Sequence, residues 1–391
     1  MDQEADDQSD LNVGVYSPEY RFKGKYSGNP PAGICLGVGE KGKTVKIAHT
    51  GFYTDYDGDF FFTCLDNISG SFLQDWISNK RRKFSKIDNC IIFIAKNNEY
   101  EVYINFPILL KMVSKKAVAK GDPIYKGDFA DIKILSFPTL SFKQNCGIIY
   151  IFSMWWRRGL YFNFLPLIQG NNEISETYPT LFAGFHSYLM FPEIYRKDPS
   201  VYDRIKSDGW FPFICIIGKQ YEKLYTAYQY DVGKGDIIKE IIDSFGPEKI
   251  RELENKWYVK KEFENHRKTI EAGIERYLAG DFISAINNLY PRIEGVLRYV
   301  HLGKGGSESV KELLNTLQQT AEDHTTPSCL FLPDDFRTYL QESFFSSFDL
   351  DTGQIDLSRH SVAHGVADEN QYNQIKALQG IFILDQISYY I

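Results

Sequence analysis

The chain has 391 residues, of which 43% are hydrophobic and 15% are aromatic, and its formal net charge is −7. This length suits two or three domains, and the composition is sufficient for packed cores. The six cysteines are scattered without a CxxC pair, which argues against a disulfide framework or a zinc knuckle and favours reduced thiols. No uninterrupted apolar run of about 18 residues occurs, so a membrane-spanning helix is not expected. We therefore expect a soluble, cytoplasmic protein that has no membrane partner.

The acidic excess lies entirely in the C-terminal part of the chain. From Arg251 to the last residue there are 14 Lys and Arg residues against 21 Asp and Glu, whereas the preceding part is balanced. A region with this charge repels the phosphate backbone and is not expected to bind nucleic acid nonspecifically. Any RNA bound there must be held by a local cationic site, by a partner, or after a conformational change.

The first part of the chain is predicted to be β-rich. Residues 1–30 begin with an acidic, polar stretch that is no secretory signal, and they are expected to be a disordered or extended tail. Residues 31–140 are expected to form a β-rich recognition domain, because 90–94 is a continuous apolar run and 100–104 alternates in strand fashion. A short helix is expected over 71–78.

Four short motifs in this part of the chain each have a functional and a structural interpretation. Residues 37–44 match the P-loop string GxxxxGK[ST], but a strand-like stretch follows them instead of a helix, which favours a hairpin turn. Residues 55–59 resemble a calcium loop with a misplaced glycine, and a turn between strands is preferred. The basic run 80–83 and the Trp-Trp-Arg-Arg stretch 155–158 could contact RNA, although a solvated face and a capped core are the preferred interpretations.

The remaining chain changes from a mixed to a helical pattern. Residues 141–235 are very aromatic and contain repeated prolines, and they are a mixed segment that either stands alone or continues the first domain. Residues 246–391 are expected to form an all-helical bundle, which gives a multi-domain α+β fold. Asp281 is the expected N-cap of one of its helices. The helices are expected over 236–245, 248–278 (one or two helices), 282–300, 309–319, 334–344 and 372–390.

The segment Ser358-Arg359-His360-Ser361-Val362-Ala363-His364-Gly365 concentrates one arginine and two histidines in a chain that has only seven histidines. An arginine fork can hold phosphate oxygens, and a histidine can transfer protons near neutral pH. These groups can promote the attack of an RNA 2′-hydroxyl on the neighbouring phosphate without a metal ion. His360 and His364 would share a helix face, whereas Arg359 and His364 would lie about 140° apart on one helix.

The pattern Arg359-His360-x3-His364-Gly365 resembles the Arg–polar–spacer–His signature of the HEPN superfamily, a group of helical domains that includes many metal-independent RNases. Residues 285–298 resemble an apolar helix that often precedes this signature, and the resemblance covers about 250–391. It implies a HEPN-like bundle that cleaves RNA to 2′,3′-cyclic phosphate and 5′-hydroxyl ends, with neither a cofactor nor a metal ion. His364 would transfer protons, Arg359 would bind the phosphate, and His360 would orient the site or assist.

The same resemblance implies a homodimer or a higher homo-oligomer with an RNA substrate. Proteins of this kind act in anti-phage, abortive-infection defence or as toxins, in which a sensor region restrains the RNase. The trigger would be phage-derived or a small molecule, and it would act at the N-terminal β-rich domain.

A function of another class stays open, namely a noncatalytic protein that binds a ligand through its β-rich half and dimerises through a HEPN-like bundle. His360 and His364 could also bind zinc from one helix face, although no HExxH glutamate accompanies them. Glu294 and Arg298, four residues apart on a helix, are expected to form a surface ion pair rather than to support a catalytic site.

Overall fold

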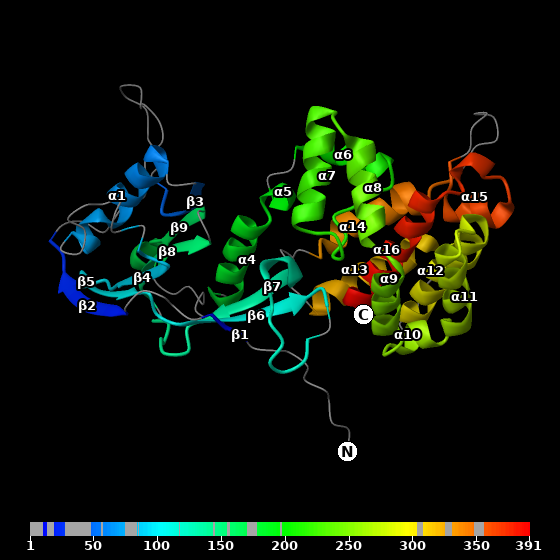
Figure 1. The fold of residues 1–391 in the computed structure, drawn as a ribbon. Helices are drawn as coiled ribbons and strands as arrows, with labels where there is room; N and C mark the ends of the chain where they lie inside the picture. The colour runs from blue at the N-terminus through cyan, green and yellow to red at the C-terminus, as the bar shows by residue number, and fades with distance from the viewer. Residues whose placement is uncertain are drawn as a thin grey trace, which may run out of the picture. The chain divides into compact units, whose positions relative to one another are not determined.

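The computed structural model of the chain has an α+β fold, with a strand-rich N-terminal region and a mostly helical C-terminal region (Figure 1). The chain divides into two compact units, residues 1–112 with 132–190 and residues 113–131 with 191–391. Among the helices in the described ranges, none combines the length and the apolar character that a bilayer crossing requires. The structure describes residues 11–13, 19–27, 48–55, 58–74, 84, 86–116, 118–143, 145–154, 157–169, 178–195, 198–302, 308–324, 331–347 and 356–391.

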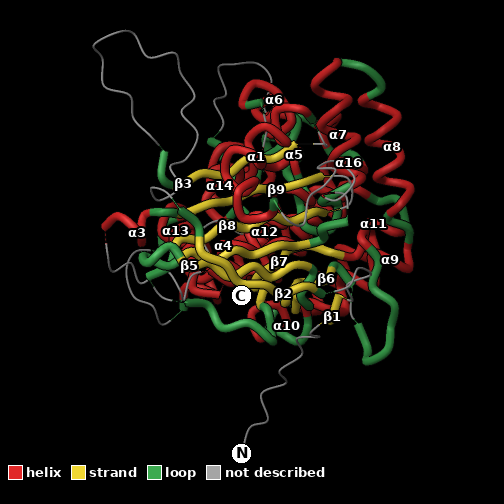
Figure 2. The backbone as a smooth tube through the Cα atoms, turned by 90° about the vertical axis from the view of Figure 1, so that its left-hand side faces the viewer, coloured by secondary structure: helices red, strands yellow, loops and turns green. Residues whose placement is uncertain are grey.

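The first unit is built on a six-stranded antiparallel sheet, whose strands are drawn in yellow in Figure 2 together with those of the smaller sheet. Its strand order is β2-β5-β4-β8-β9-β3, so the fully buried strand β4 is one of the two central strands. The elements are β2 (Tyr20–Lys25), β3 (Thr50–Asp55), α1 (Asp59–Leu73), β4 (Asn89–Ile94), β5 (Glu99–Ile104), β8 (Gly147–Met154), β9 (Arg157–Asn163), α3 (Leu165–Gln169) and α4 (Tyr178–Met190).

The two faces of this sheet carry different side chains. Alternation along β8 places Ile149 and Ile151 in the apolar core beneath α1, while Tyr150 and Phe152 belong to the opposite face. On that face the Tyr150 ring stacks on Phe182 of α4, with 4.1 Å between ring centroids. Both faces are therefore covered by helices, which explains why the central strands contain continuous apolar runs.

The strands predicted over 90–94 and 100–104 are confirmed as β4 and β5. The strand β2 lies within residues 1–30, for which a disordered or extended tail was predicted, and it pairs with β5 at the edge of the sheet. Of the helix predicted over 71–78, residues 71–73 are the end of α1, which begins twelve residues earlier at Asp59, and residues 75–78 lie outside the described residues. The spacing of its buried residues (Phe61, Cys64, Leu65, Ile68 and Phe72) is helical, and this period was the signal that the prediction missed.

A second, three-stranded sheet has the order β1-β6-β7, from β1 (Leu11–Val13), β6 (Ile108–Ser114) and β7 (Phe129–Ser136). The segment between β6 and β7 contains a short 3-10 helix (Lys126–Asp128). Residues 113–131 belong to the second compact unit, so β6 and β7 carry the chain into that unit and back out of it.

The second unit is helical, and its elements are α5 (Pro192–Tyr195), α6 (Pro199–Ser207), α7 (Lys219–Tyr230), α8 (Lys234–Ser244), α9 (Pro247–Trp257), α10 (Lys261–Glu264), α11 (Arg267–Leu278), α12 (Phe282–His301), α13 (Val310–His324), α14 (Pro333–Tyr339), a π-helical turn (Leu340–Phe344), α15 (Arg359–His364), a 3-10 turn (Glu369–Gln371) and α16 (Gln374–Tyr390). The helix α16 is buried on nearly all sides and packs against α12. These two helices form the centre of the unit.

Most of the helices predicted for this region are confirmed. The Asp281 side chain caps α12 by accepting a hydrogen bond from the Ser284 backbone N–H (3.0 Å), as the sequence predicts. The stretch 248–278 contains three helices rather than one or two. The helix predicted over 334–344 is confirmed, although its last five residues form a π-helical turn.

The aromatic stretch 141–235 divides between the two units, since the part up to residue 190 belongs to the first unit and the part from residue 191 to the second. The other domain boundaries proposed from the sequence stay predictions. Several predicted motifs lie outside the described residues, namely 37–44 and 80–83 in full, and residues 56–57 and 155–156 of the other two.

The two arginines that follow Trp156 lie within the described residues, at the start of β9. Arg157 Nη1 donates to the Leu189 carbonyl (2.7 Å), and the buried Arg158 donates from Nη1 to the Phe84 carbonyl (2.9 Å). Both guanidinium groups therefore hold backbone carbonyls, which agrees with the preferred structural interpretation of this motif.

Candidate functional site

The predicted arginine and both histidines lie on the six-residue helix α15, whose ends are fixed by the local sequence. Ser358 is the N-cap and accepts a hydrogen bond from the Ser361 N–H (3.1 Å), while Ser361 Oγ accepts one from the Ser358 N–H (2.8 Å). This reciprocal pair satisfies two backbone donors that a helix start leaves free. Gly365 ends the helix in the left-handed region, at φ +66°, which glycine adopts without strain.

Arg359 is held by a buried carboxylate on α12. Its Nε forms an ion pair with Glu294 Oε2, and α15 packs against α12 at this point. The Glu294 side chain is only 7% exposed, and its Oε1 accepts hydrogen bonds from Arg298 Nε (3.0 Å) and Nη2 (2.7 Å). Glu294 and Arg298 do pair as the sequence predicts, but the carboxylate is buried between two arginines, so the prediction of a surface pair is wrong for Glu294.

The terminal nitrogens of Arg359 are not used within the described part of the chain. Its side chain is 25% exposed, and Nη1 and Nη2 form no hydrogen bond with any residue that the structure describes. Arg298, in contrast, also pairs through Nη1 with Glu308 Oε2 (2.7 Å). The Arg359 guanidinium is therefore held at Nε, while Nη1 and Nη2 can still donate hydrogen bonds. Two such donors can bind two oxygens of one phosphate.

The two histidines of the motif differ in burial. His364 is exposed at the last position of α15. His360 is half-buried, and its ring meets the ring of Phe345 edge-on, with 6.3 Å between centroids. Because α15 contains both Arg359 and His364, five residues apart, the two side chains leave the helix about 140° apart and do not share one helix face. The helix thus presents an anchored arginine and an exposed imidazole in different directions.

Two further histidines make contacts of α12 that the sequence did not predict, namely His301, its last residue, and His266, just before α11. The His301 Nδ1 lies 2.7 Å from Thr316 Oγ1 of α13. The His266 ring lies so close to Gly295 that a Cβ there would come within 2.9 Å of the ring, and burial lowers the pKa of this imidazole. Gly295, a glycine inside the apolar helix α12, was the only sequence signal that the His266 ring approaches this helix closely. Both residues fix neighbouring elements to α12.

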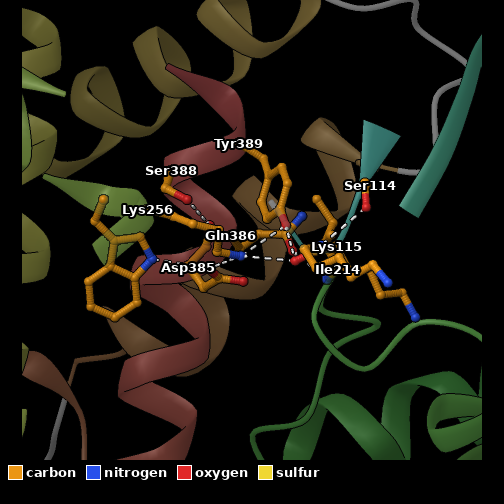
Figure 3. Close-up of polar contacts among 10 residues, drawn as sticks. Ser114, Lys115, Ile214, Lys256, Asp385, Gln386, Ser388 and Tyr389 are labelled. Carbon is orange, nitrogen blue, oxygen red and sulfur yellow. Dashed lines mark hydrogen bonds and ion pairs between the residues drawn. The ribbon is translucent and has the colours of Figure 1, made fainter. Parts of the chain in front are cut away.

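A second polar cluster joins residues 113–131 to the last helix of the chain (Figure 3). Lys256 Nζ donates to the Lys115 carbonyl (3.2 Å) and to Tyr389 Oη (3.2 Å), and it lies 3.4 Å from Asp385 Oδ1. The buried Asp385 also accepts a hydrogen bond from Trp257 Nε1 (3.0 Å). Burial raises the pKa of Asp385, and the nearby Lys256 ammonium opposes this shift. The cluster thus holds together segments that are far apart in the sequence.

No protein-family model matches this chain, and neither a curated protein nor a solved structure is similar enough to count as a match. Within the described ranges, no three His, Cys, Asp or Glu side chains lie close enough to hold a metal ion together. The chemistry of α15 must therefore be argued from its own residues.

Proposed function

We propose that this chain is a metal-independent endoribonuclease whose C-terminal helices form a HEPN-like bundle. The observation that carries the proposal is the placement of Arg359, which pairs with the buried Glu294 through Nε and keeps two nitrogens unused by the described residues. A guanidinium fixed in this way is ready to bind a phosphate without losing its orientation. The exposed His364 on the same short helix supplies a group that transfers protons near neutral pH.

In the proposed reaction, the RNA 2′-oxygen attacks the neighbouring phosphorus, a bond from the 2′-oxygen to phosphorus forms, and the bond to the 5′-oxygen breaks. One His364 takes the proton of the 2′-hydroxyl, and His364 of the partner subunit gives a proton to the leaving 5′-oxygen. Arg359 stabilises the negative charge that gathers on the phosphoryl oxygens. His360 orients the site or assists. The products carry 2′,3′-cyclic phosphate and 5′-hydroxyl ends.

The proposed site is completed by a homodimer or a higher homo-oligomer. Arg359 and His364 leave α15 in different directions, so a cleft shared by two copies of α15 would bring one motif to each side of the RNA. The acidic charge of the region beyond Arg251 means that RNA would be held locally by these arginines rather than by a broad basic surface.

We further propose that the β-rich unit is a sensor that restrains the RNase to a low basal rate in the cytoplasm until a phage-derived or small-molecule trigger reaches it. The cleavage assays below measure this basal rate. A role in anti-phage, abortive-infection defence or in toxin action follows from the HEPN resemblance. No cofactor enters the proposed reaction.

A noncatalytic protein that binds a ligand and dimerises through its helical bundle is the second candidate. The observation that favours it is the Arg359–Glu294 ion pair itself, which also ties α15 to α12 and so has structural value. In that case the histidines of α15 would transfer no proton.

The first prediction is that the purified protein cleaves RNA in EDTA and that Arg359→Ala abolishes this cleavage. Total RNA and tRNA are incubated with the protein, and the ends of the fragments are identified chemically. Arg267→Ala is the matched control, because Arg267 is an exposed arginine of α11 that pairs with Glu264 and Glu271 and lies over the Tyr258 ring. Cleavage that requires a divalent metal ion, or that survives in Arg359→Ala, would contradict the proposed function.

The second prediction concerns Glu294 as a positioning residue. Glu294→Gln keeps the shape of the side chain but removes the charge that orients Arg359, so KM for RNA is expected to rise about tenfold, equivalent to roughly 1.4 kcal/mol of binding, with kcat changed less. Steady-state kinetics on a short RNA measures both constants. Equal values of KM for the variant and the natural chain would mean that the carboxylate does not position the arginine.

A further inference from the structure

A pocket of about 580 Å³ opens in the helical unit beside the chain that leads into α15. Its walls come from the end of α6, from α7 and α8, from the π-helical turn, and from the start of α16 with the residues just before it. The buried Trp210 contributes an apolar part of the lining, and Asp356, three residues before Arg359, contributes a carboxylate. The volume is in the range of sites that take small organic ligands.

The most unusual group in this pocket is Lys376, at the third position of α16. Its ammonium group forms no hydrogen bond and no ion pair with the residues that the structure describes. Burial lowers the pKa of Lys376, and the Asp356 and Asp208 carboxylates oppose that shift from beyond ion-pair distance. A largely buried ammonium without a hydrogen-bonded partner is costly, and a ligand anion at this position would offset the cost.

The carboxylates of the pocket keep capacity for a further hydrogen-bond donor. Asp356 Oδ1 accepts one bond, from Gln371 Nε2 (3.1 Å), and Asp208 Oδ2 accepts one from Tyr228 Oη (2.5 Å). An ionised carboxylate has about four acceptor positions, so each can accept a ligand ammonium as well.

The pocket is therefore lined by opposite charges, an ammonium and two carboxylates, that lie near one another without forming an ion pair. A simple anion at Lys376 would meet the repulsion of Asp208 and Asp356, and a simple cation would meet the repulsion of Lys376. A ligand that carries both charges fits both sides. We propose that the pocket binds a small zwitterion of the amino-acid class, whose carboxylate accepts from Lys376 Nζ, whose ammonium donates to Asp356, and whose side chain lies toward Trp210. This proposal is independent of the proposed RNase activity.

The test uses the full-length protein and a panel of the twenty amino acids, with the unfolding temperature as the readout. At least one amino acid with an apolar side chain, at about 10 mM, is expected to raise Tm by about 2 °C or more. Acetate and ethylamine, which each carry one of the two charges, are expected to leave Tm unchanged at the same concentration. The affinity of the best compound is then measured by titration calorimetry.

Lys376→Met and Asp356→Asn are each expected to lose this Tm rise, whereas Glu342→Gln is expected to keep it. Glu342 is the matched control because it lies on the pocket rim and faces Lys206 (3.8 Å). The proposal is overturned if no amino acid raises Tm, if acetate alone raises it equally, or if the rise persists in both variants. A mononucleotide that raises Tm where every amino acid fails would also overturn it, because the pocket would then serve another ligand class.

Discussion

Replacing His364 by alanine is expected to abolish RNA cleavage while leaving the stability of the fold unchanged. General acid–base catalysis by a positioned side chain contributes about 10²- to 10⁴-fold, so kcat should fall by that factor. His364 is exposed at the end of α15, and substitutions at such positions change the free energy of unfolding by only about 0.5 kcal/mol or less. A large loss of activity with an unchanged Tm is therefore the expected pair of results.

His360→Ala is the matched control, because His360 lies one turn earlier on the same helix. It is half-buried against Phe345, so its replacement is expected to lower Tm slightly and to reduce kcat less than His364→Ala does. The opposite pattern, in which His364→Ala lowers Tm and cleavage continues, would support the noncatalytic interpretation of α15.

In the proposed dimer, the two copies of His364 act on the same RNA phosphate. If two copies of α15 share one cleft, a mixed dimer of the natural chain with His364→Ala contains one histidine instead of two. Co-expression of the two chains with different tags, followed by purification of the mixed species, is expected to give a dimer with almost no activity. A mixed dimer with half of the natural activity would mean that each chain carries a complete site.

The sequence predicted those parts of the structure whose signals are local. The helix α12 was predictable because its apolar residues recur at helical spacing and Asp281 supplies a capping oxygen at its start. The motif on α15 was predictable for the same reason, since Arg359, His360 and His364 lie within six residues. The helix α1 was missed because its many aromatic residues and its Asp-Gly start concealed the helical period.

The partner of Arg359 was not predictable, because Glu294 lies 65 positions earlier in the chain. The local pattern around Glu294 showed only Arg298, four residues further on, and this spacing is typical of a surface pair. Burial of the carboxylate depends on how α15 packs against α12, which is a contact that no local period encodes. The same reason applies to the pocket at Lys376, whose walls come from six separate stretches of the helical unit.

Replacing Lys115 by methionine is expected to change how the stability of the protein depends on pH. Lys115 is half-buried, and its Nζ donates to the Ile217 carbonyl. Burial lowers the pKa of this ammonium from 10.5 to about 8. The titratable groups that act on it are Lys249, which adds to the shift, and three groups that oppose it, namely Cys215, Asp128 and Glu193.

The direction of the effect follows from proton binding. Between pH 8 and 10.5 the unfolded chain keeps the Lys115 proton while the folded chain has lost it, so the free energy of unfolding of the natural chain rises across this window. Below pH 8 both forms are charged, and the folded form carries the full cost of a buried ammonium. That cost is at most about 3 kcal/mol at 1.36 kcal/mol per pKa unit, and partial exposure reduces it.

Lys115→Met is therefore expected to be more stable than the natural chain at pH 7, and this advantage is expected to shrink as the pH rises from 8 to 10.5. Urea unfolding of both proteins at several pH values measures the difference in the free energy of unfolding. Titratable groups that both proteins share contribute equally to the two free energies of unfolding, so their contributions cancel in the difference. Lys268→Met, at an exposed position of α11, controls for the loss of one positive charge and is expected to give a flat difference. A flat curve for Lys115→Met as well would mean that the Lys115 ammonium has the same pKa in the folded and unfolded chains, contrary to the expected effect of burial. Lys256 Nζ and Tyr389 Oη would still hold the Lys115 carbonyl.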